Sequence, residues 1–202
     1  LKMTGQLMCR EPGSPRDKHL RLALAFRDGG PELRFRDVRK FGFALELGGA
    51  EAAAAPELRR LGPEPLTLSF EDFRRAFAGR SGRIKARLLD QGIIAGIGNI
   101  YADEILFEAR LHPETDIARL GPASWRRLWQ AVRSVLRRAI RHHGTTFRDF
   151  RDDAGEPGGF RNRLCVYGRE GEACPRCGGS IRFLRVAGRG THCCPRCQRR
   201  RT

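Results

Sequence analysis

Hydrophobic and polar residues alternate near the start of the chain, over residues 19–26, where Leu20, Leu22, Leu24 and Phe26 fall on one face. This period of two predicts a strand that is covered on one side. The same pattern predicts two further strands, over residues 32–35 and 41–47, and residues 1–7 suggest the end of a strand entering a turn. No later stretch offers a covering sheet, so we expect the opening to be the remnant of a larger β domain.

The pattern changes to a helical period after an alanine-rich stretch and the sequence GPEP at residues 62–65. Residues 51–68 are therefore predicted to be a linker. Ser69 and Asp72 resemble a capping box that opens a helix ending near Gly79. Further helices are predicted over residues 83–90 and from Asn99 to a stop at residues 112–113.

The longest predicted helix begins after residues 121–122 and carries a continuous apolar stripe. Its members are Trp125, Leu128, Trp129, Val132, Leu136, Ala139 and Ile140. This spacing is typical of a helix face that packs into a core, so the tryptophans receive no stacking role. The helical domain is predicted to span residues 69–145. A glycine-rich loop follows within residues 146–164, and composition alone favours a plain linker there.

Two Cys-Pro-Arg-Cys pairs, Cys174 with Cys177 and Cys194 with Cys197, are separated by sixteen residues. This spacing is typical of a four-thiolate site for one structural Zn²⁺, within a module of residues 165–202. The alternative is two redox pairs or two disulfides. The insert predicts a strand and a glycine turn, and hence a β-hairpin with Arg189 at its tip. Cys193 could compete for the metal, but Cys194 keeps the two-residue gap to Cys197.

The chain is strongly basic, with 39 Lys and Arg residues against 23 Asp and Glu residues and a net charge of +16. This balance favours a nucleic-acid partner over a small neutral substrate. At 40% hydrophobic residues the chain is globular. No apolar run is long enough to span a bilayer, so no membrane partner is expected and the expected compartment is the cytoplasm.

A glycine turn containing Gly96 and Gly98 meets a predicted helix start at Asn99. Unpaired N–H groups and the positive end of the helix dipole make such a position suitable for a phosphate. Asn99 is predicted to be the N-cap, and Arg80 and Lys85, which add positive charge nearby, are predicted to contact DNA. A Walker-type loop is excluded because no Gly-Lys-Ser/Thr follows.

Several stretches, in order along the chain, resemble one family, the formamidopyrimidine-DNA glycosylases, with the endonuclease VIII branch as relatives. They are residues 1–5 (LKMTG), 37–42 (DVRKFG), 61–65 (LGPEP), 90–101 (DQGIIAGIGNIY), 143–146 (HGTT), 166–168 (VYG) and the four cysteines. The resemblance implies an α+β multidomain fold. It comprises the C-terminal part of a β-sandwich catalytic domain (residues 1–50), a helix-two-turn-helix domain and a C-terminal zinc finger.

Matched position by position, the resemblance assigns DNA contacts. Met3, Arg39 and Phe41 match residues that enter the duplex and fill the gap left by an extruded base, which is how an enzyme reaches a base inside a duplex. Asn99 matches a phosphate ligand, and Arg80 matches a basic DNA contact. Arg189 matches a hairpin arginine that assists the second elimination.

The glycine-rich loop resembles the family's cap over a flipped 8-oxoguanine, which favours this branch over endonuclease VIII. The matching residues are Asp153, Gly155, Pro157, Gly158 and Phe160. Gly159 stands where an aromatic residue is usual.

The family attacks C1′ of the damaged nucleotide with the amine of an N-terminal proline, whereas Leu1 and Lys2 begin this sequence. We therefore expect this sequence to lack the family's N-terminal catalytic segment. The resemblance implies that the full-length protein is a monomeric bacterial glycosylase and AP lyase associated with the nucleoid. It would remove 8-oxoguanine and formamidopyrimidines from damaged double-stranded DNA by base flipping and β,δ-elimination. The chain as written is expected to bind DNA and zinc without turnover.

Two other classes of function remain open. One is a non-catalytic, zinc-dependent module that binds damaged DNA. The other is a zinc-ribbon RNA-binding protein, which would leave Met3, Arg39 and Phe41 without a role.

Overall fold

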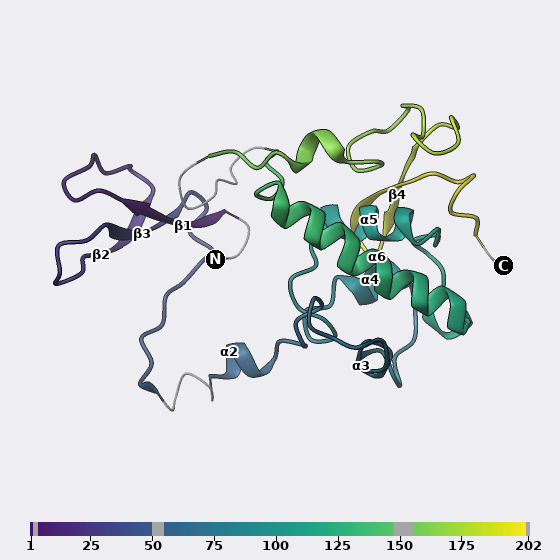
Figure 1. Ribbon diagram of the computed structural model, residues 1–202, viewed down its shortest axis with the longest axis horizontal. Helices are drawn as coiled ribbons and strands as arrows, with labels where there is room; N and C mark the ends of the chain where they lie inside the picture. The colour runs from purple at the N-terminus through teal and green to yellow at the C-terminus, as the bar shows by residue number, and fades with distance from the viewer. Residues whose placement is uncertain (2–3, 50–54, 148–155, 201–202) are drawn as a thin grey trace. The chain divides into compact units, whose positions relative to one another are not determined.

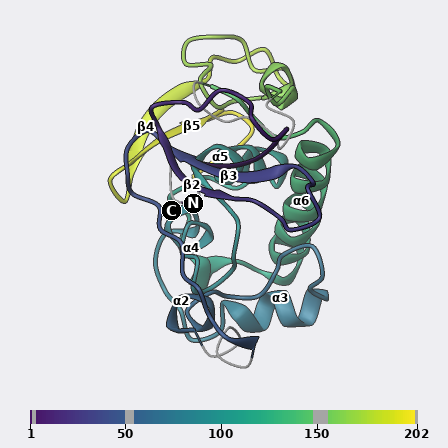
Figure 2. The same cartoon turned by 90° about the vertical axis from the view of Figure 1, so that its left-hand side faces the viewer.

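The computed structural model describes residues 1, 4–49, 55–147 and 156–200. The chain divides into two compact units. Unit 1 comprises Leu1–Gly48 and Ala139–Arg163, and unit 2 comprises Gly49–Arg138 and Leu164–Thr202. Figures 1 and 2 label the helices and strands in two views, with β1 labelled in Figure 1 and β5 in Figure 2.

Unit 1 contains a three-stranded antiparallel sheet of β1 (Gly5–Arg10), β2 (Leu20–Leu24) and β3 (Glu32–Asp37). β3 lies between the other two strands. It carries most of the buried residues of the sheet, with Phe35 and Asp37 almost fully enclosed, while β1 contributes Gln6. The Arg34 side chain of β3 is also buried, and it donates hydrogen bonds to the Pro15 and Ser14 carbonyls at 2.8 Å.

The buried carboxylate of Asp37 shapes the turn that follows β3. It accepts hydrogen bonds from the Thr4 hydroxyl at 2.5 Å and from the Gly42 N–H at 2.8 Å. These bonds favour the charged form, so the pKa of Asp37 is lowered to about 2.

The predicted strand over residues 41–47 is wrong, since the structure has no strand there, and residues 5–10 form a complete strand instead of a turn. Phe41, Phe43, Leu45 and Leu47 alternate as expected but are exposed, and no strand edge among the described residues pairs with them. Leu22, Leu24 and Phe26 are likewise exposed. An alternating pattern forms a strand only where another strand completes its hydrogen bonds.

Unit 2 is built on helices, which begin and end close to the predicted positions. They are α2 (Pro56–Arg59), α3 (Phe70–Ala76), α4 (Ile84–Leu88), α5 (Asn99–Glu108) and α6 (Pro122–Arg141), the last of which runs on into unit 1. Short 3₁₀ turns lie at Ile117–Arg119 in unit 2 and Phe160–Arg163 in unit 1. Ser69 is the N-cap of α3 and accepts a hydrogen bond from the Asp72 N–H, as the capping box predicts. α2 is an addition within the predicted linker.

The core of the helical part forms where α3 meets α6. Phe73 and Phe77 pack against Trp125 with ring centroids 6.2 and 5.3 Å from it. The predicted stripe of α6 is buried at Leu128, Val132, Leu136 and Ala139, among others. Ile140 was wrongly included, because 63% of it is exposed: it lies one position beyond the end of the buried face.

The zinc module contains an antiparallel hairpin of β4 (Arg182–Val186) and β5 (Arg189–Cys193). Ala187 and Gly188 form its turn with φ values of 48° and 75°, as a two-residue turn that follows the twist of the strands requires. Arg189 therefore begins β5 opposite Val186. The prediction that it stands at the very tip is wrong by one position.

Candidate nucleic-acid interface and zinc centre

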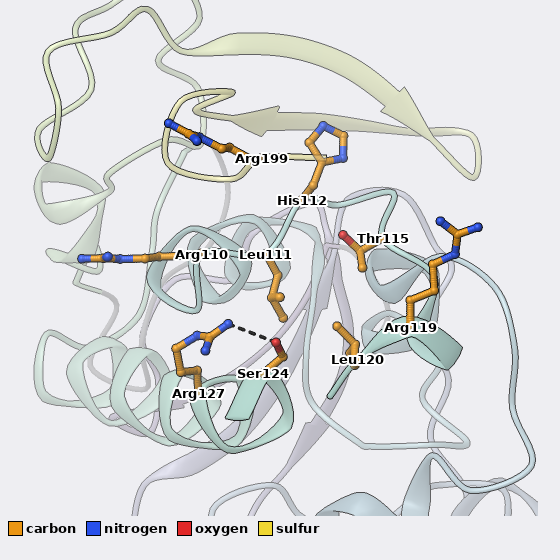
Figure 3. Close-up of a pocket in the computed structure, with 9 residues that line it drawn as sticks. All are labelled: Arg110, Leu111, His112, Thr115, Arg119, Leu120, Ser124, Arg127 and Arg199. Atoms are coloured by element: carbon orange, nitrogen blue, oxygen red, sulfur yellow. Dashed lines mark hydrogen bonds between the residues drawn. The ribbon is translucent and has the colours of Figure 1, made fainter. Parts of the chain in front are cut away.

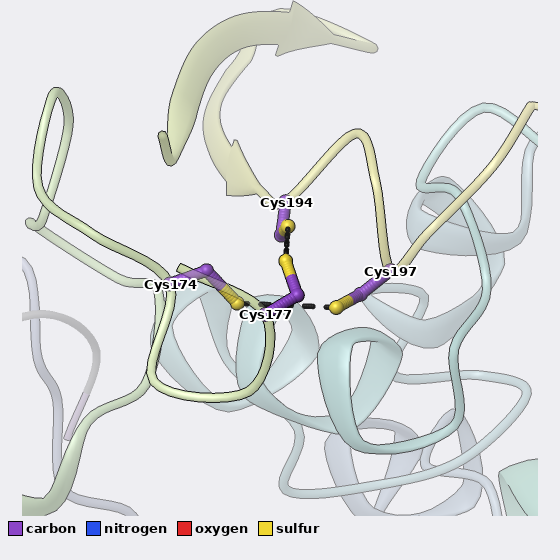
Figure 4. Close-up of side chains that lie close together, drawn as sticks. All are labelled: Cys174, Cys177, Cys194 and Cys197. Carbon is purple, nitrogen blue, oxygen red and sulfur yellow. Dashed lines mark hydrogen bonds between the residues drawn. The ribbon is translucent and has the colours of Figure 1, made fainter. Parts of the chain in front are cut away.

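The four cysteine sulfurs of the two pairs converge on one point, all lying within 4.8 Å of one another (Figure 4). Cys174 and Cys197 are 3.9 Å apart, and Cys177 and Cys194 are 3.5 Å apart, distances too long for disulfides. A tetrahedral zinc with Zn–S bonds of about 2.3 Å places its sulfurs about 3.8 Å apart. The set therefore fits one structural zinc, as predicted. Cys193 is not part of the cluster; burial raises the pKa of this thiol to about 11.

The zinc module packs on the C-terminal half of α5. Phe107 of α5 lies in one buried cluster with Val166, Ile181 and two of the cysteines. Arg176 donates a hydrogen bond to the Phe107 carbonyl at 2.9 Å and stacks over its ring at 4.1 Å. Gln198, which is fully buried, joins the Leu111 carbonyl to the Cys194 N–H. The metal-binding loops are therefore held by α5 as well as by the metal.

Glu104 fixes the chain where it enters the zinc module. Its buried carboxylate accepts hydrogen bonds from the N–H groups of Cys165, Val166 and Tyr167 at 2.8 to 2.9 Å. Burial raises the pKa of Glu104, and the three N–H donors oppose that shift. The sequence analysis did not identify this residue, because a single acid on a helix carries no spacing signal.

Lys85, on α4, binds the hairpin of β4 and β5 through residues of β5. Its ammonium group lies 2.6 Å from the Asp103 carboxylate and donates to the Gly190 carbonyl at 2.9 Å and the Thr191 hydroxyl at 2.8 Å. Its side chain is fully buried, and burial lowers its pKa, while Asp103 acts against that shift. The prediction that Lys85 contacts DNA directly is wrong in this geometry, since all three of its hydrogens are used inside the protein.

Asn99 joins the glycine turn to the same hairpin. The N-cap of α5 is Gly98, not Asn99 as predicted, and Asn99 instead donates its side-chain amide to the Gly190 carbonyl at 3.0 Å. Gln91 shapes the preceding turn by accepting from the Gly96 N–H at 2.8 Å and donating to the Ile97 carbonyl at 3.0 Å. The structure thus brings the start of α5 beside the start of β5, although ninety residues separate them in the sequence.

The arginines predicted to contact DNA are exposed. Arg80 and Arg189 face solvent in unit 2. In unit 1, Arg39 lies over the ring of Phe41 at 4.6 Å, and 54% of Phe41 is exposed. Met3 lies outside the described residues.

The predicted lesion-capping loop is described only at its C-terminal end, because Asp153 and Gly155 lie outside the described residues. Pro157 is exposed, whereas Gly158 and Phe160 are buried. The Gly158 N–H donates to the Thr146 hydroxyl at 2.8 Å, and Phe160 stacks on His142. These two residues anchor the C-terminal end of the segment, and its part in capping a flipped base stays a prediction.

Known protein families and solved structures share these features with the chain. The family model of the formamidopyrimidine-DNA glycosylase H2TH domain matches residues 61–151, and that of the zinc finger found in FPG and IleRS matches residues 171–200. The formamidopyrimidine-DNA glycosylase of Heliobacterium modesticaldum is 46% identical over 90% of this chain and 67% of its own length. The chain belongs to the formamidopyrimidine-DNA glycosylase family.

Within the family, the enzyme of Symbiobacterium thermophilum is 48% identical over 93% of this chain. This chain covers 62% of that relative's length. The solved complex of Lactococcus lactis Fpg with DNA containing an abasic site superposes with a TM-score of 0.87 at 36% identity, covering 98% of this chain and 73% of that one. The predicted fold class, with its helix-two-turn-helix domain and four-cysteine zinc finger, is confirmed. Among the described residues, no helix is long and apolar enough to cross a membrane.

Proposed function

We propose that this chain is the DNA-binding part of a base-excision glycosylase and AP lyase that acts on 8-oxoguanine and formamidopyrimidines in duplex DNA. The observation that carries the proposal is the joint fixation of the α5 start and the hairpin. Lys85 and Asn99 both donate to the Gly190 carbonyl, beside the exposed Arg189. Two elements suited to adjacent phosphates are thereby held rigidly together.

At the start of α5, the backbone N–H groups and the helix dipole supply the proposed phosphate site. Gly98 caps the helix without a side chain, so nothing from the cap itself occupies this end. The Asn99 amide is already bonded to Gly190. Its proposed part is to hold the helix start against the hairpin, in addition to the phosphate contact that the family match implies.

Arg189 is proposed to stabilise the charge on the phosphate that leaves in the second elimination. A guanidinium group suits this role because it remains charged and forms two parallel hydrogen bonds to a phosphate. Its backbone is fixed by β-sheet pairing with Val186 and by the Lys85 contact one residue later.

In unit 1, Arg39 and Phe41 are proposed to enter the duplex together with Met3. An exposed aromatic ring with a guanidinium stacked upon it offers an apolar wedge and a charge for the opposite strand. Inserting such a wedge offsets the cost of unstacking when a base is extruded.

Borohydride trapping on a duplex with 8-oxoguanine opposite cytosine tests the proposal. The 202-residue chain is expected to bind without forming an adduct, because none of its residues matches the family's proline amine. A version extended at its N-terminus with the corresponding segment of the Symbiobacterium relative is expected to form one. If neither forms an adduct and both bind tightly in a zinc-dependent way, the enzyme proposal fails and a damage-binding module remains.

Arg189→Gln in the extended chain is expected to leave base removal intact and to shift the cleaved products from δ- towards β-elimination. Arg185→Gln is the matched control, since Arg185 is exposed on β4 of the same hairpin. Equal product ratios for the two variants would remove Arg189 from the proposed role.

A further inference from the structure

A groove lies in unit 2 between α3 and the first turn of α6. Three aromatic residues line it, Phe70, Phe77 and Trp125, together with two arginines, Arg74 and Arg75. Its volume is about 370 Å³, within the range of about 300 to 1,000 Å³ that is usual for ligand pockets. The groove is therefore large enough to receive part of another molecule.

The aromatic residues form the floor of the groove. Phe77 and Trp125 are 3% and 9% exposed, with ring centroids 5.3 Å apart. Phe70 is half-buried and packs edge-on against Trp129 at 6.0 Å. Aromatic residues and arginine are the types enriched at the centre of protein–protein interfaces. This floor suits an apolar side chain, whereas a phosphate group has no apolar surface to place on it.

The indole N–H of Trp125 is an unused hydrogen-bond donor. It has no acceptor among the described residues, whereas the indole N–H of Trp129 donates to the Leu68 carbonyl at 3.1 Å. It is also not among the side-chain atoms that the described structure encloses without a partner, so it can be reached from outside the protein. A buried tryptophan usually finds a partner for this group. A carbonyl or carboxylate oxygen of a molecule in the groove would supply one.

The rim of the groove carries arginines. Arg74 is exposed, and its side chain forms no ion pair and no hydrogen bond within the described part of the chain. Arg75 is bonded to Asp72 at 2.8 Å, but its side chain remains 75% exposed. Arg126 of α6 lies over the ring of Phe70 at 4.4 Å. Arg74 is thus the cation best placed to bind a carboxylate.

The rim also contains one acid of the lining, Glu71, which lies one turn before Arg75 on α3. With Asp72 it leaves the three arginines in excess. α6, which forms the other side of the groove, carries six arginines and no acidic residue. A negatively charged segment is therefore attracted to this surface, and Glu71 directs its carboxylates towards Arg74.

The groove is separate from the elements proposed to bind DNA. In both views α3 lies at the opposite end of unit 2 from the hairpin of β4 and β5, with α4 between them (Figures 1 and 2). An occupant of the groove would therefore leave the hairpin and the start of α5 open.

A smaller cavity beside the C-terminal end of α5 shows what a binding site requires. Its volume is about 20 Å³, and a single water needs about 10 to 15 Å³ of such space. Figure 3 shows the side chains of Arg110, Arg119 and Arg199 pointing away from it, while Arg127 donates to Ser124 at 3.0 Å. That cavity holds about one water, whereas the groove beside α3 combines room, an apolar floor and a free donor.

We propose that the groove beside α3 docks an acidic segment of a partner protein. The segment places one aromatic or aliphatic side chain on the floor formed by Phe77 and Trp125 and a carboxylate against Arg74. One of its oxygens accepts the indole N–H of Trp125. This interaction goes beyond the proposed repair activity and does not depend on it.

The test titrates the zinc-loaded chain with the acetylated and amidated pentapeptide DDFDD at constant ionic strength. The NMR signal of the Trp125 indole N–H reports occupancy, and that of Trp129, which is already bonded to Leu68, is the internal reference. A saturable shift at Trp125 is expected, with a Kd at or below about 1 mM. The peptides DDSDD, which lacks the apolar side chain, and KKFKK, which reverses the charge, should bind at least about tenfold more weakly.

Arg74→Glu should weaken binding of DDFDD about tenfold. Arg137→Glu is the matched control, because Arg137 is an exposed arginine on α6 outside the groove, and it should leave binding unchanged. Ala78→Gln is the second variant: Ala78 is an exposed residue of the lining, so a longer side chain there narrows the groove and should also weaken binding.

The proposal is overturned if DDFDD gives no saturable shift in that range or binds no more tightly than DDSDD. It is overturned as well if Arg137→Glu weakens binding as much as Arg74→Glu, since long-range attraction alone would then explain the result. A single-stranded thymidine oligonucleotide that shifts Trp125 at lower concentration than DDFDD would make the groove a nucleic-acid site instead. A Trp125 shift that grows with protein concentration alone would identify a second copy of the chain as the occupant.

Discussion

The zinc-bearing unit and the N-terminal sheet differ in how far they bury their side chains. In unit 2 even charged groups are enclosed and paired, as Lys85 is with Asp103 and Glu104 with three N–H groups. In the sheet of unit 1 even large apolar groups are exposed, with Leu22 and Leu24 of β2 37% and 46% accessible. Unit 2 contains the partners of its own side chains, whereas the apolar face of the sheet has none among the described residues.

This difference indicates where the stability of the chain resides. Burying a leucine or phenylalanine side chain stabilises a fold by about 1.5 to 3 kcal/mol. The sheet lacks that contribution at several positions where its apolar residues are exposed. Its stability comes from Phe35 and from the buried polar groups of β3. Variants should therefore have large effects in unit 2 and small effects on the open face of the sheet.

Loss of zinc should have the largest effect. Structural zinc contributes about 10 to 16 kcal/mol of binding free energy in small zinc modules, so Cys177→Ser or chelation should abolish hydrogen-exchange protection in β4 and β5. The strands of unit 1 should keep theirs. Cys9→Ser, at an exposed cysteine of β1, is the control. Protection of the hairpin that survives metal removal would contradict the view that the metal supports this unit.

Asp103→Asn should have the next largest effect, because it leaves the buried ammonium of Lys85 without its counter-ion. Breaking a buried pair in this way costs about 3 to 5 kcal/mol, measurable by urea unfolding. Glu172→Gln breaks an exposed pair with Arg169 and should cost less than about 1 kcal/mol. The double variant Lys85→Met/Asp103→Leu should recover part of the loss. Equal effects of Asp103→Asn and Glu172→Gln would show that the pair does not hold the hairpin.

Local patterns in the sequence predicted the parts of the fold that depend on neighbours in the chain. The Ser69 cap, the buried face of α6 and the four zinc cysteines follow from spacing alone, and each is found where predicted. The roles of Lys85, Asn99 and Glu104 could not be predicted in this way. Their partners in the zinc module lie 61 to 106 residues away, and no local period encodes a contact of that range.

The strand predicted over residues 41–47 shows that a local pattern can also predict an element that does not form. Its alternation in the sequence is real, but Phe43 and Leu45 are exposed, and so are Ala44 and Glu46 between and after them. A strand also needs an edge to pair with, and composition cannot show whether one is present.

Gly158→Ala should have an intermediate and local effect. A Cβ at this position would lie 2.4 Å from the Gly144 carbonyl oxygen, whereas at Gly159 the nearest atom would be 3.7 Å away. Gly158→Ala should therefore cost about 1 to 3 kcal/mol and reduce exchange protection of the Phe160 amide, which bonds Gly144. Gly159→Ala is the control and should leave that protection unchanged. Equal protection in both variants would mean that the close approach does not anchor the loop.

Leu24→Ser should have the smallest effect, within about 0.5 kcal/mol, because 46% of Leu24 is already exposed on the open face of β2. Phe35→Ala, on the buried side of the same sheet, should cost about 3 to 5 kcal/mol and shows that the assay senses unit 1. The same Leu24→Ser change in the chain extended with the segment from the Symbiobacterium relative sharpens the comparison. If that segment covers the sheet, the cost should rise to about 1.5 to 3 kcal/mol. An unchanged cost would mean that the apolar face is solvated in the extended chain as well, and that the contrast between the two units is intrinsic to the fold.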